Sequence, residues 1–138
     1  MNEQRNYALQ ERLNKSIREA STMIWVTFQK VGFHSFPAAQ IDPALEDVSY
    51  LGFKHRHLFK FKVWIEVFHN DREIEFHQFL SFCESLFSEK NIDINFQSVE
   101  MLADNLYTSI SKKFPDRDVW VEVSEDGECG CFKQYDKE

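Results

Sequence analysis

Alternating hydrophobic and polar residues predict that two long strands form the centre of the fold. The first covers residues 23–33, and the second lies within residues 53–68. In the second strand the odd-numbered side chains share one face and are mostly apolar, which indicates a buried face. The apolar residues of this face are Phe59, Phe61, Val63, Ile65 and Val67. Residues 37–50 lie between the two strands, contain prolines without a clear period, and are predicted to be a long loop.

Helical spacing marks three other segments. Apolar residues recur at every fourth position from Leu9 to Ile17, so we expect a helix with a narrow apolar seam near the N-terminus. Such a seam suits a helix that lies on the domain, a helix that meets its copy in another subunit, or a mobile arm. Residues 77–90 and 98–114 carry apolar residues three and four positions apart, and Ser98 is a suitable N-cap for the second of these helices.

The remaining segments complete a small sheet. Residues 73–76 are expected to form a short third strand after a turn, and residues 119–123 a fourth. Residues 131–135 can add a last short strand, whereas residues 91–97 are expected to be a connector. Strands and helices in this order predict an α+β fold with an antiparallel four-stranded sheet and two helices on one face.

Composition indicates one ordinary domain that binds neither nucleic acid nor membrane. The chain has 138 residues and 43% hydrophobic content, so we expect a single domain in residues 22–138 and an N-terminal helical extension in residues 1–21. The formal net charge of -7 argues against a nucleic-acid-binding surface, which must neutralise phosphates. No apolar run approaches the roughly 20 residues that cross a bilayer, and the N-terminus lacks a signal-peptide pattern, so a cytoplasmic location is expected.

Cysteine and phenylalanine content refine this picture. The three cysteines are an odd number without a C-x-x-C pair, so neither a disulfide framework nor a thiolate zinc site is indicated. The fourteen phenylalanines fall mostly on the predicted strands and on the first core helix. We expect them to fill the core and an interface between subunits.

Histidines near the ends of the two long strands are the main candidates for chemistry. His55 and His57 are two apart in a strand and therefore project from the same face, at one end of the apolar row. A buried neutral imidazole needs a partner for each ring nitrogen, so this pair indicates a metal ion or a polar cavity. His34 follows the first strand directly. Imidazoles that only hydrogen-bond to the backbone are the alternative for these residues.

Short motifs occur in a defined order along the chain. They are Phe33-His34, His55-Arg56-His57, Glu75-Phe76, Ser98 to Ala103 and Val121 to Glu125. In this order they resemble the 6-pyruvoyl-tetrahydropterin synthase and 6-carboxytetrahydropterin synthase family, whose subunits have the tunnelling fold. The corresponding family positions carry a zinc-binding His, a His-Gly-His, an Asp-Phe, a Pro-Thr-x-Glu helix start and a pterin-binding Glu. The resemblance covers residues 23–135.

The resemblance implies a zinc ion held by His34, His55 and His57, with a fourth coordination position open to a ligand. It implies that Glu125 accepts hydrogen bonds from the amino group and ring N–H of a pterin- or purine-like heterocycle, and that Ser98 takes part in ligand binding. Because Glu125 lies in an acidic run, a solvated turn carboxylate is the alternative reading of this residue. In the family a neighbouring subunit completes the pocket and trimers stack into hexamers, so a homo-oligomer is expected.

The chain departs from the family pattern at the catalytic positions. The family's Cys before the His-x-His pair is missing, and its Asp-His pair corresponds to Ser88 and Glu89. General acid–base groups contribute about 10² to 10⁴ in rate, so we expect family catalysis to be lost or altered while binding remains. His77 and Glu89 are candidate substitute acid–base residues, and Cys129 and Cys131 are less favoured ones.

These observations predict a zinc-containing, pterin-synthase-like protein that binds a pterin- or purine-like heterocycle in a pocket between subunits. One alternative is an active zinc-dependent lyase of the 6-pyruvoyl- or 6-carboxy-tetrahydropterin synthase type, which uses substitute acid–base residues. Another is a metal-free structural or interaction protein that keeps only the fold. Metal content separates the last alternative from the other two.

Overall fold

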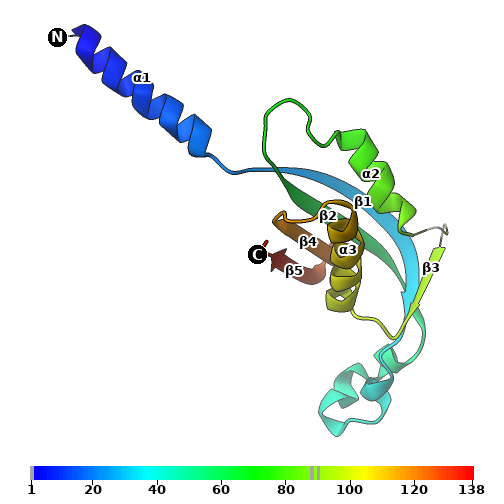
Figure 1. The fold of residues 1–138 in the computed structure, drawn as a ribbon. Coiled ribbons are helices and arrows are strands. Elements are labelled where there is room, and N and C mark those ends of the chain that lie inside the picture. The colour runs from blue at the N-terminus through cyan, green and yellow to red at the C-terminus, as the bar shows by residue number, and fades with distance from the viewer. Residues whose placement is uncertain (1, 88, 90) are drawn as a thin grey trace.

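The computed structural model describes residues 2–87, 89 and 91–138, and its centre is a five-stranded mixed sheet (Figure 1). The strands follow the order β3-β1-β2-β4-β5 across the sheet. They are β1 (Thr22–His34), β2 (His55–Val67), β3 (Asn91–Asn95), β4 (Val119–Glu125) and β5 (Cys129–Tyr135). Neighbouring strands are antiparallel except for β3, which runs parallel to β1. The predicted α+β class is therefore confirmed.

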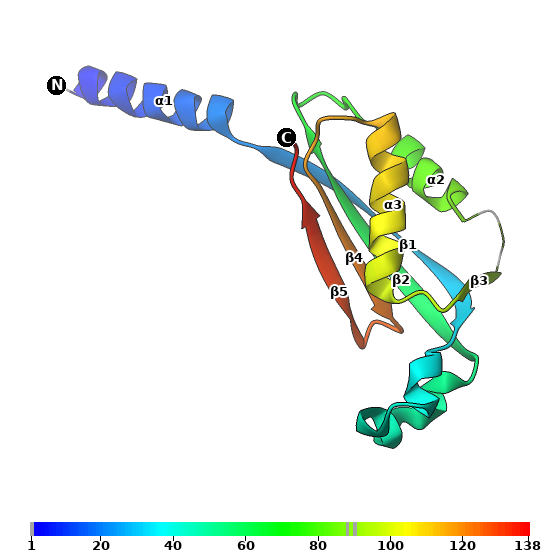
Figure 2. The ribbon, with the colours of Figure 1, turned by 60° about the horizontal axis from the view of Figure 1, so that its bottom comes forward.

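Strands β1 and β2 form the central pair of the sheet, and each is thirteen residues long. They pair along their full length, from Thr22 opposite Val67 to His34 opposite His55. The apolar odd-numbered side chains of β2 join a buried core with α2 (Phe76–Ser85) and α3 (Val99–Lys113). Both helices cover the same face of the sheet (Figures 1 and 2). One face of the sheet is thus covered, and the other is open to solvent in a single chain.

The sheet differs from the predicted four-stranded antiparallel sheet in two places. Residues 73–76 do not form a strand, because Glu75 caps α2 and its side chain accepts a hydrogen bond from the Gln78 N–H at 2.7 Å. Residues 91–95, predicted to be a connector, form β3 instead. The two isoleucines of β3 are buried while its polar residues face outward. Because three of its five residues are polar, the segment was predicted to be a connector rather than a strand. The sheet therefore has five strands rather than four.

The helices begin close to their predicted positions. α3 starts after Ser98, whose hydroxyl accepts a hydrogen bond from the Met101 N–H at 3.2 Å, as predicted for an N-cap. α2 ends at Ser85, before the predicted end at residue 90, and residues 88 and 90 lie outside the described residues. The segment predicted to be a long loop contains two 3-10 helices, η1 (Pro37–Gln40) and η2 (Pro43–Gly52).

The N-terminal helix α1 (Asn2–Glu19) lies where the helical extension was predicted. None of its residues is buried, and it extends away from the sheet and from the other helices (Figures 1 and 2). Its apolar seam from Leu9 to Ile17 is exposed and does not pack on the domain. Across the part of the chain that the structure describes, no helix combines the length and the apolar character needed to cross a bilayer.

Candidate metal centre

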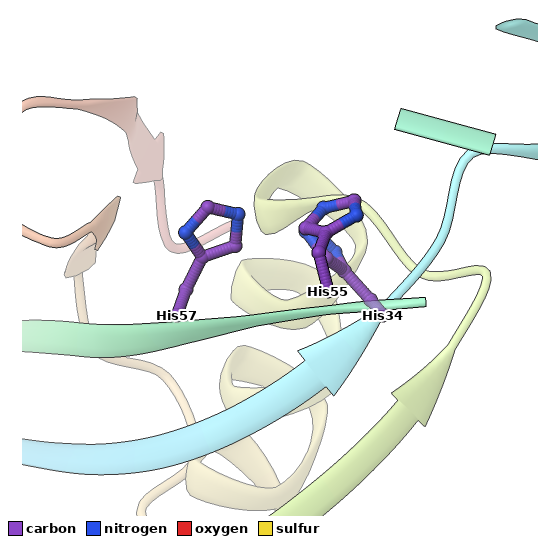
Figure 3. Close-up of side chains that lie close together, drawn as sticks. All are labelled: His34, His55 and His57. Carbon is purple, nitrogen blue, oxygen red and sulfur yellow. The ribbon is translucent and has the colours of Figure 1, made fainter. Parts of the chain in front are cut away.

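Three histidines come together where β1 ends and β2 begins. In the β1–β2 ladder His34 is the direct partner of His55, and Gly32 is the partner of His57. The three rings stand on the same side of the sheet (Figure 3), because side chains two apart on a strand share a face. One ring nitrogen of each histidine lies within 4.8 Å of the others. The structure therefore brings together the three residues predicted to hold zinc.

Each imidazole is oriented by a hydrogen bond at its Nδ1 atom. The acceptors are the Gln97 carbonyl oxygen for His34 at 3.0 Å, the Phe53 carbonyl oxygen for His55 at 2.8 Å and the Asp126 carboxylate for His57 at 2.7 Å. An oxygen acceptor requires Nδ1 to carry the proton, so each neutral ring presents an unprotonated Nε2 atom. Histidines that bind metal ions are typically held in this way.

Two of the free Nε2 atoms face a carboxylate. Glu125 places one oxygen 3.3 Å from Nε2 of His34 and the other 3.4 Å from Nε2 of His57. In neutral rings both members of each pair are acceptors, so no hydrogen bond joins them. Nε2 of His57 is buried and has no hydrogen-bond partner in the described part of the chain. A cation bound by the three imidazoles satisfies the lone pairs of their Nε2 atoms, and three imidazole nitrogens are a donor set that suits Zn²⁺.

Asp126 is the site residue that the sequence analysis missed. Its carboxylate accepts hydrogen bonds from the Leu58 N–H at 2.8 Å and from His57 at 2.7 Å. These bonds, that from Leu58 first, lower the pKa of Asp126, so the side chain is a carboxylate at neutral pH. The Asp126-Gly127 sequence indicates a turn. No local signal shows that this turn meets a histidine 69 residues earlier in the chain.

A cavity of about 330 Å³ opens beside the histidines. Its lining residues are His34, Ser35, Phe36, Leu51, His55, Phe96, Gln97, Ser98, Val99, Glu100 and Glu125. The two candidate ligand-binding residues, Ser98 and Glu125, therefore face the same space as two of the histidines. Phe36 and Phe96 are 45% and 70% exposed, so the wall of the cavity offers aromatic surface to a ligand.

The two candidate catalytic residues lie away from the histidines. His77 is near the start of α2, where its neighbour Glu75 lines a separate cavity together with Thr22, the first residue of β1. Because His34 is the last residue of β1, His77 is near the other end of the sheet. Glu89 is exposed between α2 and β3 and does not line the cavity beside the histidines.

The two C-terminal cysteines differ in their relation to the site. Cys129 is exposed and is the cross-strand partner of Glu125, whereas Cys131 is the partner of Val123. Burial, followed by the charge of Glu100, raises the pKa of the Cys131 thiol above its ordinary value. Neither cysteine is among the described residues that line the cavity beside the histidines, and both line a separate cavity together with Lys60 and Ser124.

The arrangement as a whole suits the binding of a metal ion and a small polar molecule. Three oriented imidazoles can hold a divalent ion with a coordination position left open, and Glu125 adds two acceptor oxygens beside a cavity. No cysteine and no aspartate is among the described residues that line this cavity. In comparisons with known proteins the chain matches no family model and no curated protein, so the assignment of the site depends on its geometry.

Proposed function

We propose that this chain is a zinc-binding protein that captures a pterin- or purine-like heterocycle in the cavity beside its three histidines. The observation that carries the proposal is the common orientation of His34, His55 and His57, whose Nδ1 atoms all meet oxygen acceptors. An unpaired buried polar atom costs about 1–3 kcal/mol, and Nε2 of His57 is such an atom without a cation. When bound, zinc supplies a Lewis acid that polarises an oxygen of the ligand.

The lining of the cavity supports a flat heterocycle as the ligand. A volume of about 330 Å³ lies at the lower end of the range for small-molecule sites. Glu125 supplies two acceptor oxygens, which match the amino group and ring N–H that pterins and guanine-like purines share. Phe36 and Phe96 add exposed rings on which a flat ring system can stack. The Ser98 oxygen accepts the helix-cap bond, which leaves its O–H free to donate.

We further propose that the reaction of the resembling family is lost or altered here. The family's proton-transferring Cys is missing from this sequence, its Asp-His pair is replaced by Ser88 and Glu89, and neither His77 nor Glu89 is among the residues of the cavity wall. An active lyase is the second candidate function, because Cys129 is exposed and pairs with Glu125 across the β4–β5 ladder, so that it lies next to the cavity although it does not line it. A thiol in that position can exchange a proton with a ligand that Glu125 anchors.

The unpaired edges of the sheet support self-association of the chain. Among the described residues, β3 pairs with β1 only at residues 31–34, which leaves residues 22–30 as an edge. β5 forms the other edge of the sheet. Exposed strand edges are templates for pairing with another chain. We propose a homo-oligomer, a trimer or a hexamer, in which a neighbouring subunit completes the pocket.

Native mass spectrometry of freshly purified protein tests the zinc site and the assembly together. The expected result is a trimer or hexamer with about one zinc ion per chain. Changing His55 and His57 together to Ala is expected to remove the zinc, whereas His77→Ala, an exposed histidine outside the cluster, is expected to leave it. A wild-type protein that takes up no zinc from a zinc-containing buffer contradicts the proposal and supports a structural or interaction protein.

Incubation with dihydroneopterin triphosphate, followed by product analysis, separates binding from catalysis. Binding without turnover is the expected result. Turnover at a rate typical of enzymes, about 1 to 10³ s⁻¹, contradicts the binding-protein proposal and supports the lyase. In that case Cys129→Ser is expected to abolish turnover, because Cys129 is the thiol opposite Glu125.

A further inference from the structure

Asp126 differs from the other two groups that orient the histidines, because it is a side chain and the others are backbone carbonyls. We infer that Asp126 is a positioning residue that fixes His57 in the tautomer with the proton on Nδ1, so that Nε2 is available to a metal ion. This role rests on the proposed zinc site. It makes the turn between β4 and β5 a determinant of metal affinity.

Two backbone hydrogen bonds hold Asp126 in register with β2. Its N–H donates to the Leu58 carbonyl oxygen at 2.8 Å, and its Oδ1 atom accepts from the Leu58 N–H at 2.8 Å. Oδ1 is therefore occupied by a donor that the strand keeps in place, and Oδ2 is left to meet Nδ1 of His57 at 2.7 Å. The turn requires positive φ angles, 59° at Asp126 and 73° at Gly127, which Asp and Gly adopt more readily than most residues.

A structural role and a positioning role give opposite expectations for Asp126→Asn. Asparagine keeps the size, the preference for positive φ and an oxygen that accepts from the Leu58 N–H, so a purely structural role survives the change. Its amide nitrogen takes the place of Oδ2 and is a donor. Nδ1 of His57 must then act as an acceptor, and the ring proton moves to Nε2.

Glu125 stabilises the changed tautomer of His57. Its carboxylate oxygen lies 3.4 Å from Nε2 of His57 and can accept a hydrogen bond from that atom once it carries the proton. Both ring nitrogens then have partners without a metal ion, and the lone pair of the ring points away from the cluster. Asp126→Asn is therefore expected to fold and yet to bind zinc weakly.

Zinc affinity of the full-length protein is measured by competition with a chromogenic chelator. Loss of a group that orients a metal-bound histidine typically weakens metal binding about 10- to 100-fold, which is the effect expected for Asp126→Asn. Asp126→Ala is expected to lose less, because it removes the acceptor without adding a donor. Asp116→Asn is the matched control, since Asp116 is exposed and has a φ of 59° in another bend of the chain. This control is expected to bind zinc as the wild type does.

Nitrogen-15 NMR of the imidazole rings in metal-free protein reports the tautomer of His57, which stays the same if Asp126 has only a structural role. His57 is expected to carry its proton on Nδ1 in the wild type and on Nε2 in Asp126→Asn. Wild-type zinc affinity in Asp126→Asn, or the same His57 tautomer in both proteins, overturns the role of Asp126 and leaves the zinc site standing.

Failure of the proposed zinc site and failure of the positioning role of Asp126 give different results. A wild type that binds no zinc refutes the zinc site, while the NMR comparison still decides what Asp126 does. Circular dichroism checks the fold of each variant. Should Asp126→Asn fail to fold, unchanged zinc affinity in Asp126→Ala overturns the positioning role and a weakened affinity supports it.

Discussion

Gly32→Ala tests how the sheet supports the metal centre. Gly32 lies opposite His57, and a Cβ atom at this position would lie 2.7 Å from two ring atoms of Phe59 and 2.9 Å from the Ile92 side chain. Ordinary contact begins at 3.4 Å, so the Phe59 ring must move by about 0.7 Å, from 2.7 to 3.4 Å, in a core with few voids. Phe59 is 0% exposed and therefore has no solvent to move into.

The expected loss of stability follows from two opposing effects. Forcing an extra methyl group into a packed core costs about 1–3 kcal/mol. Replacing Gly returns about 0.4–1 kcal/mol, because the unfolded chain loses conformational freedom. The midpoints of these two ranges are about 2 and about 0.7 kcal/mol, so the free energy of unfolding is expected to fall by about 1.3 kcal/mol. Zinc affinity is expected to fall as well, because the centroid of the Phe59 ring lies 5.3 Å from that of His34 and 5.8 Å from that of His57.

Urea unfolding followed by tryptophan fluorescence measures this loss, with an unchanged m-value as the sign that only stability has changed. Gly52→Ala is the comparison, because a Cβ atom there would lie 2.1 Å from Cγ of Gln40, an exposed side chain that can turn about χ1 into water, whereas Phe59 is enclosed by the core. An unchanged midpoint in Gly32→Ala, or an equal loss in Gly52→Ala, contradicts the close packing of Phe59 beneath the histidines.

Three other outcomes are expected. Glu125→Gln is expected to weaken heterocycle binding about 10- to 100-fold in calorimetry, because an acceptor oxygen becomes a donor, and to leave the zinc content unchanged. The hydrogen bond from Arg117 lowers the pKa of Glu73 from 4.5 to about 2, so the stability that this pair contributes is present above pH 4.5 and is lost as the pH falls toward 2. Arg117→Ala is expected to remove this part of the acid dependence, measured as unfolding midpoints against pH. Burial raises the pKa of Cys83 to about 12, so a thiol reagent is expected to label Cys129 in the folded protein and Cys83 only after unfolding.

Each of these outcomes has an opposite that decides against it. Zinc loss in Glu125→Gln makes Glu125 a metal ligand rather than the anchor of the heterocycle. If Arg117→Ala leaves the dependence of the unfolding midpoint on pH unchanged, the ion pair with Glu73 does not contribute to stability. Equal labelling of Cys83 and Cys129 in the folded protein contradicts the burial of Cys83.

Elements with a strong local pattern could be predicted from the sequence. β1 alternates at residues 24–29, β2 has an apolar row at the odd positions of residues 59–67, and α3 has both an N-cap at Ser98 and a helical apolar period. β3 could not be predicted, because only two of its residues are apolar and its partner β1 lies far away along the chain. The strand predicted at residues 73–76 was wrong because Glu75 serves as a helix cap, a use of the side chain that a period of two does not reveal.

The three histidines of the candidate site could be predicted from the sequence, but the groups that hydrogen-bond to them could not. His55 and His57 share a face because of their spacing, and His34 follows a recognisable strand. Asp126 and the Gln97 carbonyl reach their histidines across 69 and 63 residues of chain. Contacts at such separation depend on which strands pair and in what register, and neither is encoded in a local pattern.

The sequence by itself determined which residues alternate, where helices are capped and which imidazoles share a face, because backbone geometry repeats over two to four residues. Only the tertiary structure decided that His34 lies opposite His55, that Asp126 holds His57 and that Glu125 faces two ring nitrogens. These relations require the β1–β2 register and the β4–β5 turn together. They arise from packing between distant segments, and for that reason the histidine cluster is a property of the folded chain.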